Sequence, residues 1–246
     1  MKLDDEAAIR ELNWDSERFG IRVGELQVGN ASASDVKGML EVQSGNFDLI
    51  YVRGANHELM PAEVLETFRG QHTDTRATFE MSPIVVPAPV TPRVRGQVRI
   101  IEPNEMSDDL VALALQAAEH SRFRNDERFS NAWVDKLYRI WIQRAVAHER
   151  SDEVLVFADE AKLLGLYTIR VLEGTGHLEL FAVDHRQRGK GVGAALLVAG
   201  LAWMRDHQIA CASVATQLRN PVCRLYRELG YSLTHTEEIY HLWPHS

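Results

Sequence analysis

The sequence predicts an α+β fold built around a mixed β-sheet. Three observations favour this class. Strand-like and helical segments alternate irregularly along the chain, three consecutive strand-like segments follow a pair of helices, and 45% of the 246 residues are hydrophobic. A chain of this length buries most of its unfolded surface, so a substantial core is expected. The order after residue 97 is strand, two helices, three strands, helix, strand, helix and strand, which is typical of an α+β domain.

Residues 1–90 are expected to form a small α/β domain without a catalytic motif. Apolar runs indicate its strands, and amphipathic runs between them indicate its helices. The expected strands cover 19–28, 47–54 and 76–82, and the expected helices cover 33–42 and 59–70. Residues 81–96 hold four of the eight prolines and have no regular period, so they predict a linker.

Residues 97–246 are expected to form the second domain, with longer and more regular elements. The expected strands cover 97–103, 153–159, 162–172, 176–184, 209–217 and 231–243. The expected helices cover 106–120 and 131–149, then a helix that starts at the glycines near residue 190 and runs through Asp206, and 221–229. Together these elements would form one mixed sheet with helical layers.

Charge and cysteine content limit the partners. The formal net charge is −8, whereas nucleic acid and anionic membranes favour a basic surface, so neither is expected as a partner. Cys211 and Cys223 show no disulfide or metal-ligand spacing, so no metal site is expected. The N-terminus lacks the apolar core of a signal peptide, and the apolar run 191–204 is shorter than the roughly 20 residues that span a bilayer. A cytoplasmic location is therefore expected.

The stretch RQRGKGVGAALL, residues 186–197, predicts an anion site. It carries three glycines and three cations, namely Gly189, Gly191, Gly193, Arg186, Arg188 and Lys190. At the start of a helix, unpaired backbone N–H groups and the helix dipole both favour an anion. The alternative is a glycine-rich turn with solvated arginines.

Two common nucleotide-binding patterns fit this stretch poorly. A dinucleotide site needs its glycines directly after a strand and an acidic residue about 20 positions later. Here DHRQR separates the strand from Gly189, and the later segment IACASVATQ has no acidic residue. A P-loop needs Ser or Thr after its lysine, but Gly follows Lys190. A diphosphate fits the site that remains.

Residues 97–244 resemble the GNAT family of acetyl-CoA-dependent N-acyltransferases. The resemblance rests on R-x-x-G-x-G at Arg188, Gly191 and Gly193 and on NPVCRLYRELGY at 220–231. It implies a GNAT fold preceded by an incomplete GNAT-like half, acetyl-CoA as co-substrate, and a strand ending at Val183 that splays from its neighbour. The residues implied to hold coenzyme A are Phe181, Ala182, Val183, Arg188, Gly189, Lys190, Gly191, Val192, Gly193, Ala194 and Asn220.

Three residues are candidates for proton transfer. The resemblance implies that Tyr226 protonates the thiolate that leaves the thioester; the alternative is core packing on a helix. His177 and Glu179 share one face of a strand and are candidates to remove the proton of the amine through water. The alternative is that both are polar residues that face solvent on a half-buried strand. A backbone N–H near Phe181 or Ala182 would stabilise the oxyanion.

The acceptor is predicted from residues 121–146, which lie where the family places its acceptor-side helices. The expected contacts are Ser121, Arg122, Phe123 and Arg124. The two arginines can form bidentate bonds to phosphate, although such a stretch is also typical of a solvated connection. With residues 12–21 and 214–220, this region resembles the dTDP-fucosamine acetyltransferases of polysaccharide biosynthesis. That resemblance implies a dTDP-linked 4-amino-4,6-dideoxyhexose as acceptor.

Other functions stay open at the level of sequence. A GNAT enzyme for another amine, such as an aminoglycoside or a protein N-terminus, would favour an acidic acceptor cleft, whereas a nucleotide sugar would favour a basic one. A non-catalytic acyl-CoA-binding module is the third possibility. Finally, the last strand carries Ile239 and Leu242, which are expected to be exposed. We therefore expect this strand either to pair between the subunits of a homodimer or to be an ordinary edge strand.

Overall fold

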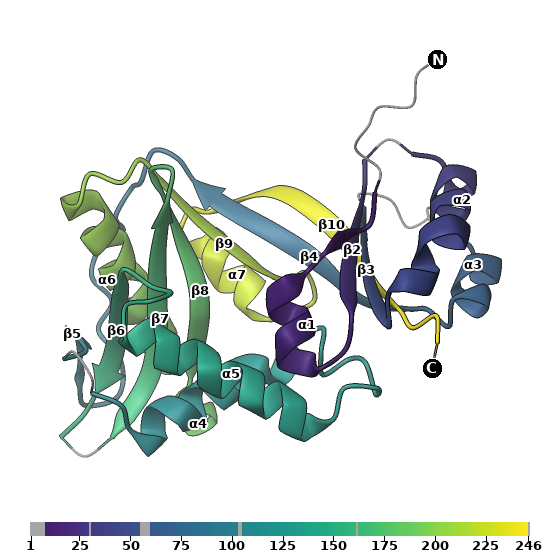
Figure 1. Cartoon of the computed structure of the whole chain (residues 1–246). Helices are drawn as coiled ribbons and strands as arrows, with labels where there is room; N and C mark the ends of the chain where they lie inside the picture. Colours follow the sequence, from purple (N-terminus) through teal and green to yellow (C-terminus); the bar gives the residue numbers. More distant parts are fainter. Residues whose placement is uncertain (1–7, 30, 55–59, 103–104, 161, 246) are drawn as a thin grey trace. The chain divides into compact units, whose positions relative to one another are not determined.

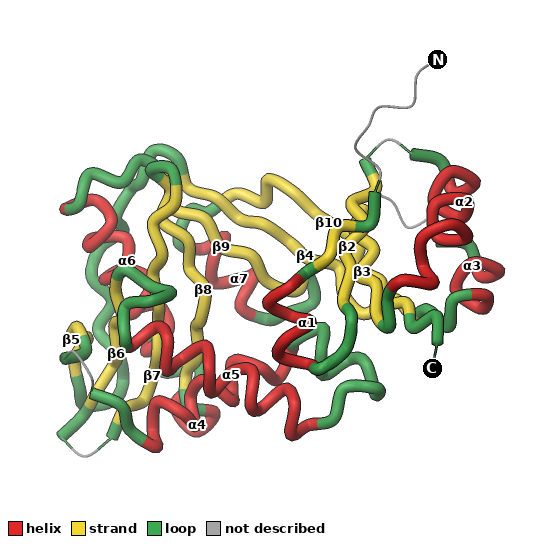
Figure 2. The backbone as a smooth tube through the Cα atoms, viewed as in Figure 1, coloured by secondary structure: helices red, strands yellow, loops and turns green. Residues whose placement is uncertain are grey.

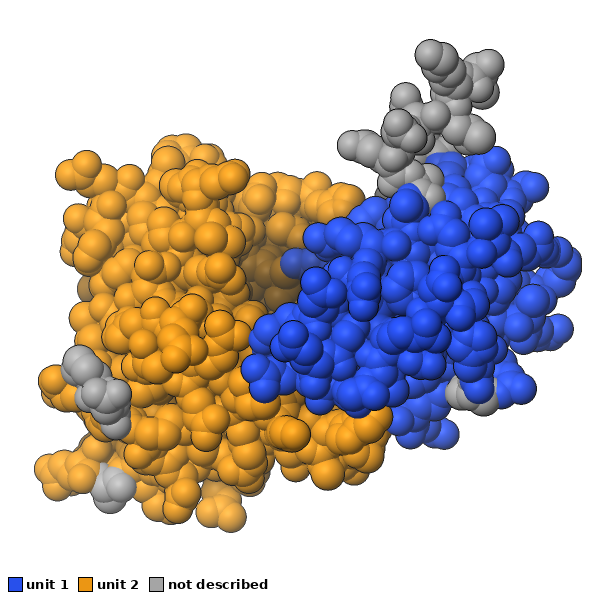
Figure 3. Space-filling view, viewed as in Figure 1, with its two compact units in different colours: residues 1–76, 125–128, 236–246 blue, residues 77–124, 129–235 orange. Residues whose placement is uncertain are grey.

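The computed structural model describes residues 8–29, 31–54, 60–102, 105–160 and 162–245. The chain forms two compact units, coloured separately in Figure 3: unit 1 is residues 1–76, 125–128 and 236–246, and unit 2 is residues 77–124 and 129–235. These units divide the chain at other residues than the expected boundary at 90–97. The reason is that strands β4 (Gln71–Met81) and β10 (Ser232–Leu242) each contribute residues to both units.

Unit 1 is a small mixed sheet with helices α2 and α3 on one side of its strands (Figure 1). The strand order is β1-β2-β3-β10-β4, with β2 parallel and β10 antiparallel to β3. Its apolar core gathers Leu26, Val36, Leu40 and Val52. The elements are β1 (Arg10–Glu11), α1 (Asn13–Phe19), β2 (Val23–Val28), α2 (Ala33–Gln43), β3 (Leu49–Gly54) and α3 (Ala62–Thr67).

A buried polar cluster around Asp126 ties the segment 125–128 into unit 1. The Asp126 carboxylate lies 2.8 Å from His241 Nδ1 and accepts a hydrogen bond of 2.9 Å from Trp243 Nε1. It also accepts the Arg128 backbone N–H at 3.1 Å. Neither the Asp126 nor the His241 side chain is exposed to solvent. The cluster thus fixes a loop segment to the end of β10 by side-chain contacts.

Unit 2 carries the larger sheet, in the order β4-β9-β8-β7-β6-β5. Strands β5 to β8 pair antiparallel in succession, and β8 pairs parallel to β9. Helices α4 and α5 lie on one side of these strands and α6 and α7 on the other (Figure 2). The elements are β5 (Gln97–Ile100), α4 (Asp108–Ala117), α5 (Asn131–Val146), β6 (Glu153–Ala158), β7 (Leu163–Leu172), β8 (Thr175–Val183), α6 (Val192–Asp206), β9 (Cys211–Gln217) and α7 (Val222–Glu228).

Local sequence explains where several helices begin. Ser32, Ser107 and Ser130 each accept a backbone N–H from the first turn of the helix that follows, at 3.2 to 3.3 Å. Such caps replace hydrogen bonds that the first turn of a helix cannot make internally. Helix α1 was not expected, because its seven residues are too few to show a clear apolar period.

The α+β class with a mixed sheet is confirmed, but the expectation for the last strand is wrong. Strand β10 lies between β3 and β4 rather than at an edge. Its residues Ile239 and Leu242 are buried in unit 1. Over Glu238–Leu242, which pair with β3, both sides of the strand are therefore occupied, so this half offers no free edge for pairing between subunits.

The proline-rich segment 81–96 packs on unit 2 instead of forming a free linker. Its residues Ile84, Val86 and Val94 contact the core of unit 2. The Arg93 backbone N–H donates to the Lys190 carbonyl at 2.8 Å. The absence of a regular period correctly indicated a segment without helix or strand, but it carried no information about this packing.

Within the part of the chain that the structure describes, no helix is both long enough and apolar enough to cross a bilayer. The same described residues contain no group of three or more histidine, cysteine or acidic side chains placed to hold a metal ion.

Candidate active site

Unit 2 contains a cavity of about 650 Å³ at the place where β8 and β9 separate. Its walls come from the end of α4 and the turn after it, from the second half of β8, from the glycine loop, from the end of β9 and from α7. A cavity of this size lies within the range of small-molecule and cofactor sites.

The separation of β8 and β9 can be followed in the register of the strands. Their paired residues run from Thr175 opposite Cys211 to Leu178 opposite Val214 and go no further, although β8 continues to Val183. Near the same place the β7–β8 register shifts, and the Leu180 N–H donates to the Thr168 hydroxyl at 2.9 Å instead of to a strand carbonyl. The end of β8 therefore has an edge that faces the cavity, as the resemblance implied.

The glycine loop has the backbone that an anion site needs. Gly189 and Gly191 have φ angles of 74° and 91°, in the left-handed region that favours glycine, and Gly191 caps the N-terminus of α6. A Cβ on Gly191 would also lie 3.2 Å from the Pro92 Cα. The N–H groups of the first turn of α6 have no carbonyl within the helix to bind, so they can point toward a phosphate.

The charged side chains of this loop are held by neighbours. Arg188 Nε donates to the Val183 carbonyl at 3.1 Å, and its terminal nitrogen lies 2.9 Å from the Glu119 carboxylate. Lys190 Nζ donates to Gln187 Oε1 at 2.9 Å. Among the predicted cofactor residues, Arg188, Gly189, Gly191, Gly193 and Ala194 line the cavity, and Lys190 and Val192 do not.

Tyr226 lies in the cavity wall with a nearly buried side chain. It is 2% exposed and packs against Phe79 and Tyr231, with ring centroids 5.7 and 5.8 Å away. Burial, assisted by nearby Tyr231 and Cys223, raises the pKa of the Tyr226 phenol far above its usual range. The phenol keeps its proton at neutral pH, as an ordinary phenol also does, and burial makes it a weaker acid.

Asn220 lies at the start of α7 and also lines the cavity. Its side-chain oxygen accepts the Val222 backbone N–H at 3.1 Å, which caps the first turn of that helix. The cap orients α7 and with it Tyr226. Phe181, Ala182 and Val183 line the cavity from the end of β8.

The two candidates for proton removal differ in position. Glu179 lines the cavity, where Arg150 and Arg170 contact its carboxylate. His177 is paired in the sheet, opposite Arg170 on β7 and Ser213 on β9, and is not one of the residues that line the cavity. The alternation along the strand gave both residues the same face, but β8 borders the cavity only from Leu178 onward, where its pairing with β9 ends.

The four predicted acceptor contacts do not line this cavity. Ser121 is buried, and its hydroxyl accepts the Phe123 N–H at 3.2 Å. The Arg122 guanidinium lies 4.7 Å from the centroid of the Phe123 ring. Arg124 pairs with Asn131 and Asp135 at the start of α5. These residues shape the turn before α5 around buried contacts.

Sequence reasoning missed Tyr138 on α5, which lines the cavity. Burial raises the pKa of the Tyr138 phenol, and Ser121, Arg122, Arg124 and Arg150 oppose that shift. The only signal in the sequence is the amphipathic pattern of α5, which marks Tyr138 as core-facing but cannot show that this core position borders a cavity.

Comparison with known proteins identifies the family of this site. Residues 115–231 match the model of the acetyltransferase (GNAT) family. Comparison with curated protein sequences gives no significant match.

Solved structures share the fold of the chain at low sequence identity. A functionally unknown conserved protein from Staphylococcus epidermidis aligns with a TM-score of 0.63 and 11% identity, over 99% of this chain and 94% of its own. A GCN5-related N-acetyltransferase from Kribbella flavida aligns with a TM-score of 0.56 and 15% identity, over 92% and 82%.

A tandem GNAT protein from the clavulanic acid biosynthesis pathway aligns with a TM-score of 0.56 and 12% identity, over 87% of this chain and 70% of its own. These likenesses concern the fold alone, and they agree with a second, GNAT-like part beside the matched domain. The family match covers the glycine loop, the splayed end of β8 and Tyr226 together. Residues 115–231 therefore carry a GNAT acetyltransferase domain, and the chain that contains them has the GNAT fold.

Proposed function

We propose that this protein transfers the acetyl group of acetyl-CoA to the amino group of a dTDP-linked 4-amino-4,6-dideoxyhexose. The observation that carries the choice of acceptor is the sequence resemblance of residues 12–21, 121–146 and 214–220 to dTDP-fucosamine acetyltransferases. Within that region Arg122 and Arg124 oppose the effect of burial on the pKa of the cavity-lining Tyr138, and Arg124 also pairs with Asp135. Arginines that reach the acceptor would favour an anionic nucleotide sugar over a cationic aminoglycoside.

In this proposal coenzyme A lies in the cavity between β8 and α7. The backbone of Phe181, Ala182 and Val183 holds the pantetheine arm, and the first turn of α6 binds the diphosphate. Left-handed glycines in the loop and the unpaired end of β8 support this assignment. The assigned loop residues are Arg188, Gly189, Lys190, Gly191, Val192, Gly193 and Ala194, with Asn220 on the opposite wall.

The chemistry assigned to the side chains is direct attack of the amine on the thioester. The amine nitrogen forms the new bond to the acetyl carbon, the carbon–sulfur bond breaks, and Tyr226 donates its proton to the leaving sulfur. Glu179 receives the proton of the amine through water. A backbone N–H near Phe181 donates to the carbonyl oxygen as charge develops on it. The position of Glu179 and Tyr226 in one cavity supports these roles.

The experiment is a measurement of free thiol released from acetyl-CoA with three acceptors. These are a dTDP-4-amino-4,6-dideoxyhexose, the same amino sugar without its nucleotide, and an aminoglycoside. We expect the highest kcat/KM with the dTDP-linked sugar. Arg122→Gln should raise KM for the dTDP-linked sugar while leaving KM for acetyl-CoA unchanged. Equal kcat/KM for all three amines, or a preference for the aminoglycoside, would remove the nucleotide sugar as substrate.

A further inference from the structure

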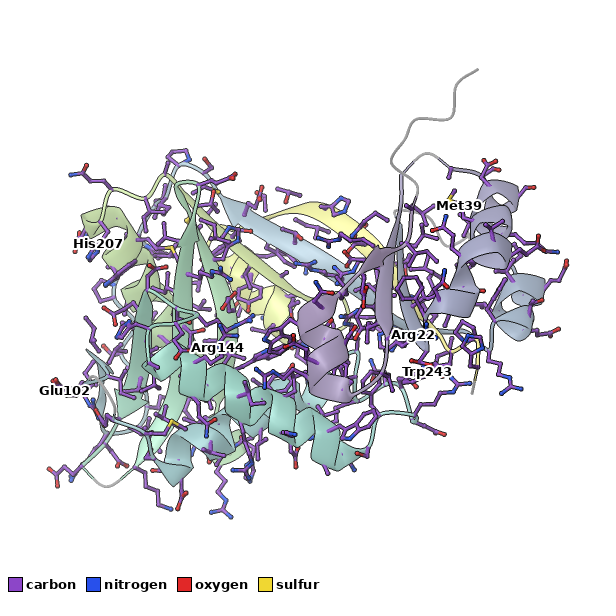
Figure 4. All side chains as sticks on the ribbon, in the orientation of Figure 1. Arg22, Met39, Glu102, Arg144, His207 and Trp243 are labelled. Carbon is purple, nitrogen blue, oxygen red and sulfur yellow. The ribbon has the colours of Figure 1, made fainter. Side chains whose placement is uncertain are left out.

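Arg150 is the residue that the sequence gave no reason to notice, because it lies in a short connection between α5 and β6. Its backbone N–H donates to the carbonyl of Arg144, labelled in Figure 4, at 3.2 Å. Its guanidinium carbon lies 5.0 Å from the centroid of the Trp141 ring, which itself packs on Tyr138 with ring centroids 4.8 Å apart. The end of α5 thus holds Arg150 in two ways: it binds the backbone N–H, and the Trp141 ring packs against one face of the guanidinium.

The nitrogens of the Arg150 guanidinium contact the Glu179 carboxylate. Arg150 Nε and Glu179 Oε2, both buried atoms, form an ion pair at 3.0 Å without hydrogen-bond geometry, and a terminal nitrogen of Arg150 donates a hydrogen bond to Oε1 at 3.3 Å. This hydrogen bond and the ion pair beside it hold the carboxylate on the side of Arg150. Arg170 also contacts Glu179, but through one nitrogen at 3.7 Å and with a more exposed side chain.

We propose that Arg150 is a positioning residue for acetyl transfer, which acts by holding the Glu179 carboxylate in the orientation that receives the acceptor amine. The inference rests on the proposed role of Glu179 and extends it to a residue outside the cavity wall. A group that takes a proton must face the amine within hydrogen-bond reach, so a carboxylate free to rotate loses rate without any loss of coenzyme binding. The planar guanidinium of arginine can present two nitrogens to one carboxylate, whereas lysine has a single ammonium nitrogen.

The test is a double-mutant cycle with Arg150→Met and Glu179→Gln, measured as kcat/KM for the amine. Arg150→Met should lower kcat/KM by about 10- to 100-fold. The kcat/KM of Arg150→Lys should lie between the values for wild type and for Arg150→Met. In the Glu179→Gln background, Arg150→Met should have no further effect, because its target is already gone. The dissociation constant of acetyl-CoA should not change in any of these variants.

Arg170→Met is the matched control, since it removes another cation from the same carboxylate. Arg170→Met should lower kcat/KM by a smaller factor than Arg150→Met does. The inference is overturned if Arg150→Met costs the same factor with Glu179 and with Gln at that position, or if Arg170→Met is the more damaging variant. Should Arg150→Met not fold, the cycle is run with Arg150→Lys, and thermal unfolding identifies the folded variants.

The amine in the cycle is the one that the wild-type protein acetylates fastest, from a panel of the three acceptors above and hydroxylamine. If only hydroxylamine or the aminoglycoside is acetylated, the nucleotide sugar is removed as substrate, and the double-mutant cycle can still be measured with the amine that reacts. Failure of the wild-type protein to acetylate any of these amines would overturn the proposed function and this inference together.

Discussion

Two shielded carboxylates, one in each unit, each contact two side-chain partners but differ in their surroundings. Asp126 in unit 1 binds His241 and Trp243, and its side chain is inaccessible to solvent. Glu179 in unit 2 binds two arginines and also borders a cavity of about 650 Å³. The number of partners alone would not tell these two carboxylates apart.

The difference lies in what each carboxylate has left to bind. Nothing outside the protein can reach Asp126, so its hydrogen bonds serve only to hold the segment 125–128. Glu179 has one side toward its arginines and another toward open space, so a ligand can reach it. A buried polar network indicates stability, and the same network beside a cavity indicates chemistry.

The largest effect is expected at Asp126, and on folding. Asp126→Ala leaves buried His241 and Trp243 without their shared acceptor, and breaking a buried pair in this way costs about 3 to 5 kcal/mol. Urea unfolding should show this loss, with kcat/KM of the folded fraction little changed. The exposed neighbour Glu127→Ala is the control and should leave the free energy of unfolding within about 0.5 kcal/mol of wild type. A large loss of kcat/KM in folded Asp126→Ala would give this carboxylate a functional role.

Tyr226→Phe should give the largest loss of rate. Removing the phenol proton that reaches the leaving sulfur should lower kcat by about 100-fold or more, with an unchanged dissociation constant for coenzyme A. Tyr231→Phe is the matched control, since Tyr231 packs on Tyr226 but does not line the cavity. Steady-state kinetics and calorimetric titration measure the two quantities. Equal rates for the two variants would remove Tyr226 as the acid.

Gly191→Ala should weaken acetyl-CoA binding by about 10-fold, because a non-glycine residue at this left-handed position costs about 1 to 2 kcal/mol and the new Cβ meets Pro92. Gly174→Ala is the control. Gly174 is also left-handed, but it lies in the turn between β7 and β8 with open space around it. Isothermal titration with coenzyme A should separate the two variants. Equal binding by both would mean that the loop backbone does not hold the diphosphate.

The smallest effect is expected at Glu119, whose pair with Arg188 is about half exposed. Pairs of this kind contribute less than about 1 kcal/mol. Glu119→Gln should release Arg188 toward the diphosphate and tighten coenzyme A binding by about 2- to 3-fold, an effect that added salt should reduce. Weaker binding in this variant would mean that Glu119 holds Arg188 in the position that binds the cofactor.

The sequence located the elements of unit 2 well because their apolar periods are long. The expected strand at 176–184 is β8 (Thr175–Val183), and the helix expected to start at the glycines is α6 (Val192–Asp206). Helix α5 ends at Val146, three residues before the expected end, because the polar end of a helix has no apolar signal. The two motifs likewise marked the glycine loop and Tyr226, which both line the cavity.

Side-chain partners were beyond the reach of the sequence. Arg124 resembles a phosphate ligand in the segment SRFRND, yet it pairs with Asn131 and Asp135. Arg150 resembles an ordinary surface charge, yet it holds Glu179. His177 and Glu179 share a strand pattern, and the end of the β8–β9 pairing places only Glu179 at the cavity.

The sequence by itself determined the fold class, the loop that starts α6 and the motif that contains Tyr226, because these depend on local periodicity and on backbone conformations that glycine permits. Only the tertiary structure decided which polar residues meet. It placed Arg150 on Glu179 and Asp126 on His241 across separations of 29 and 115 residues. Such contacts depend on how distant strands and helices pack, and no local pattern encodes that packing.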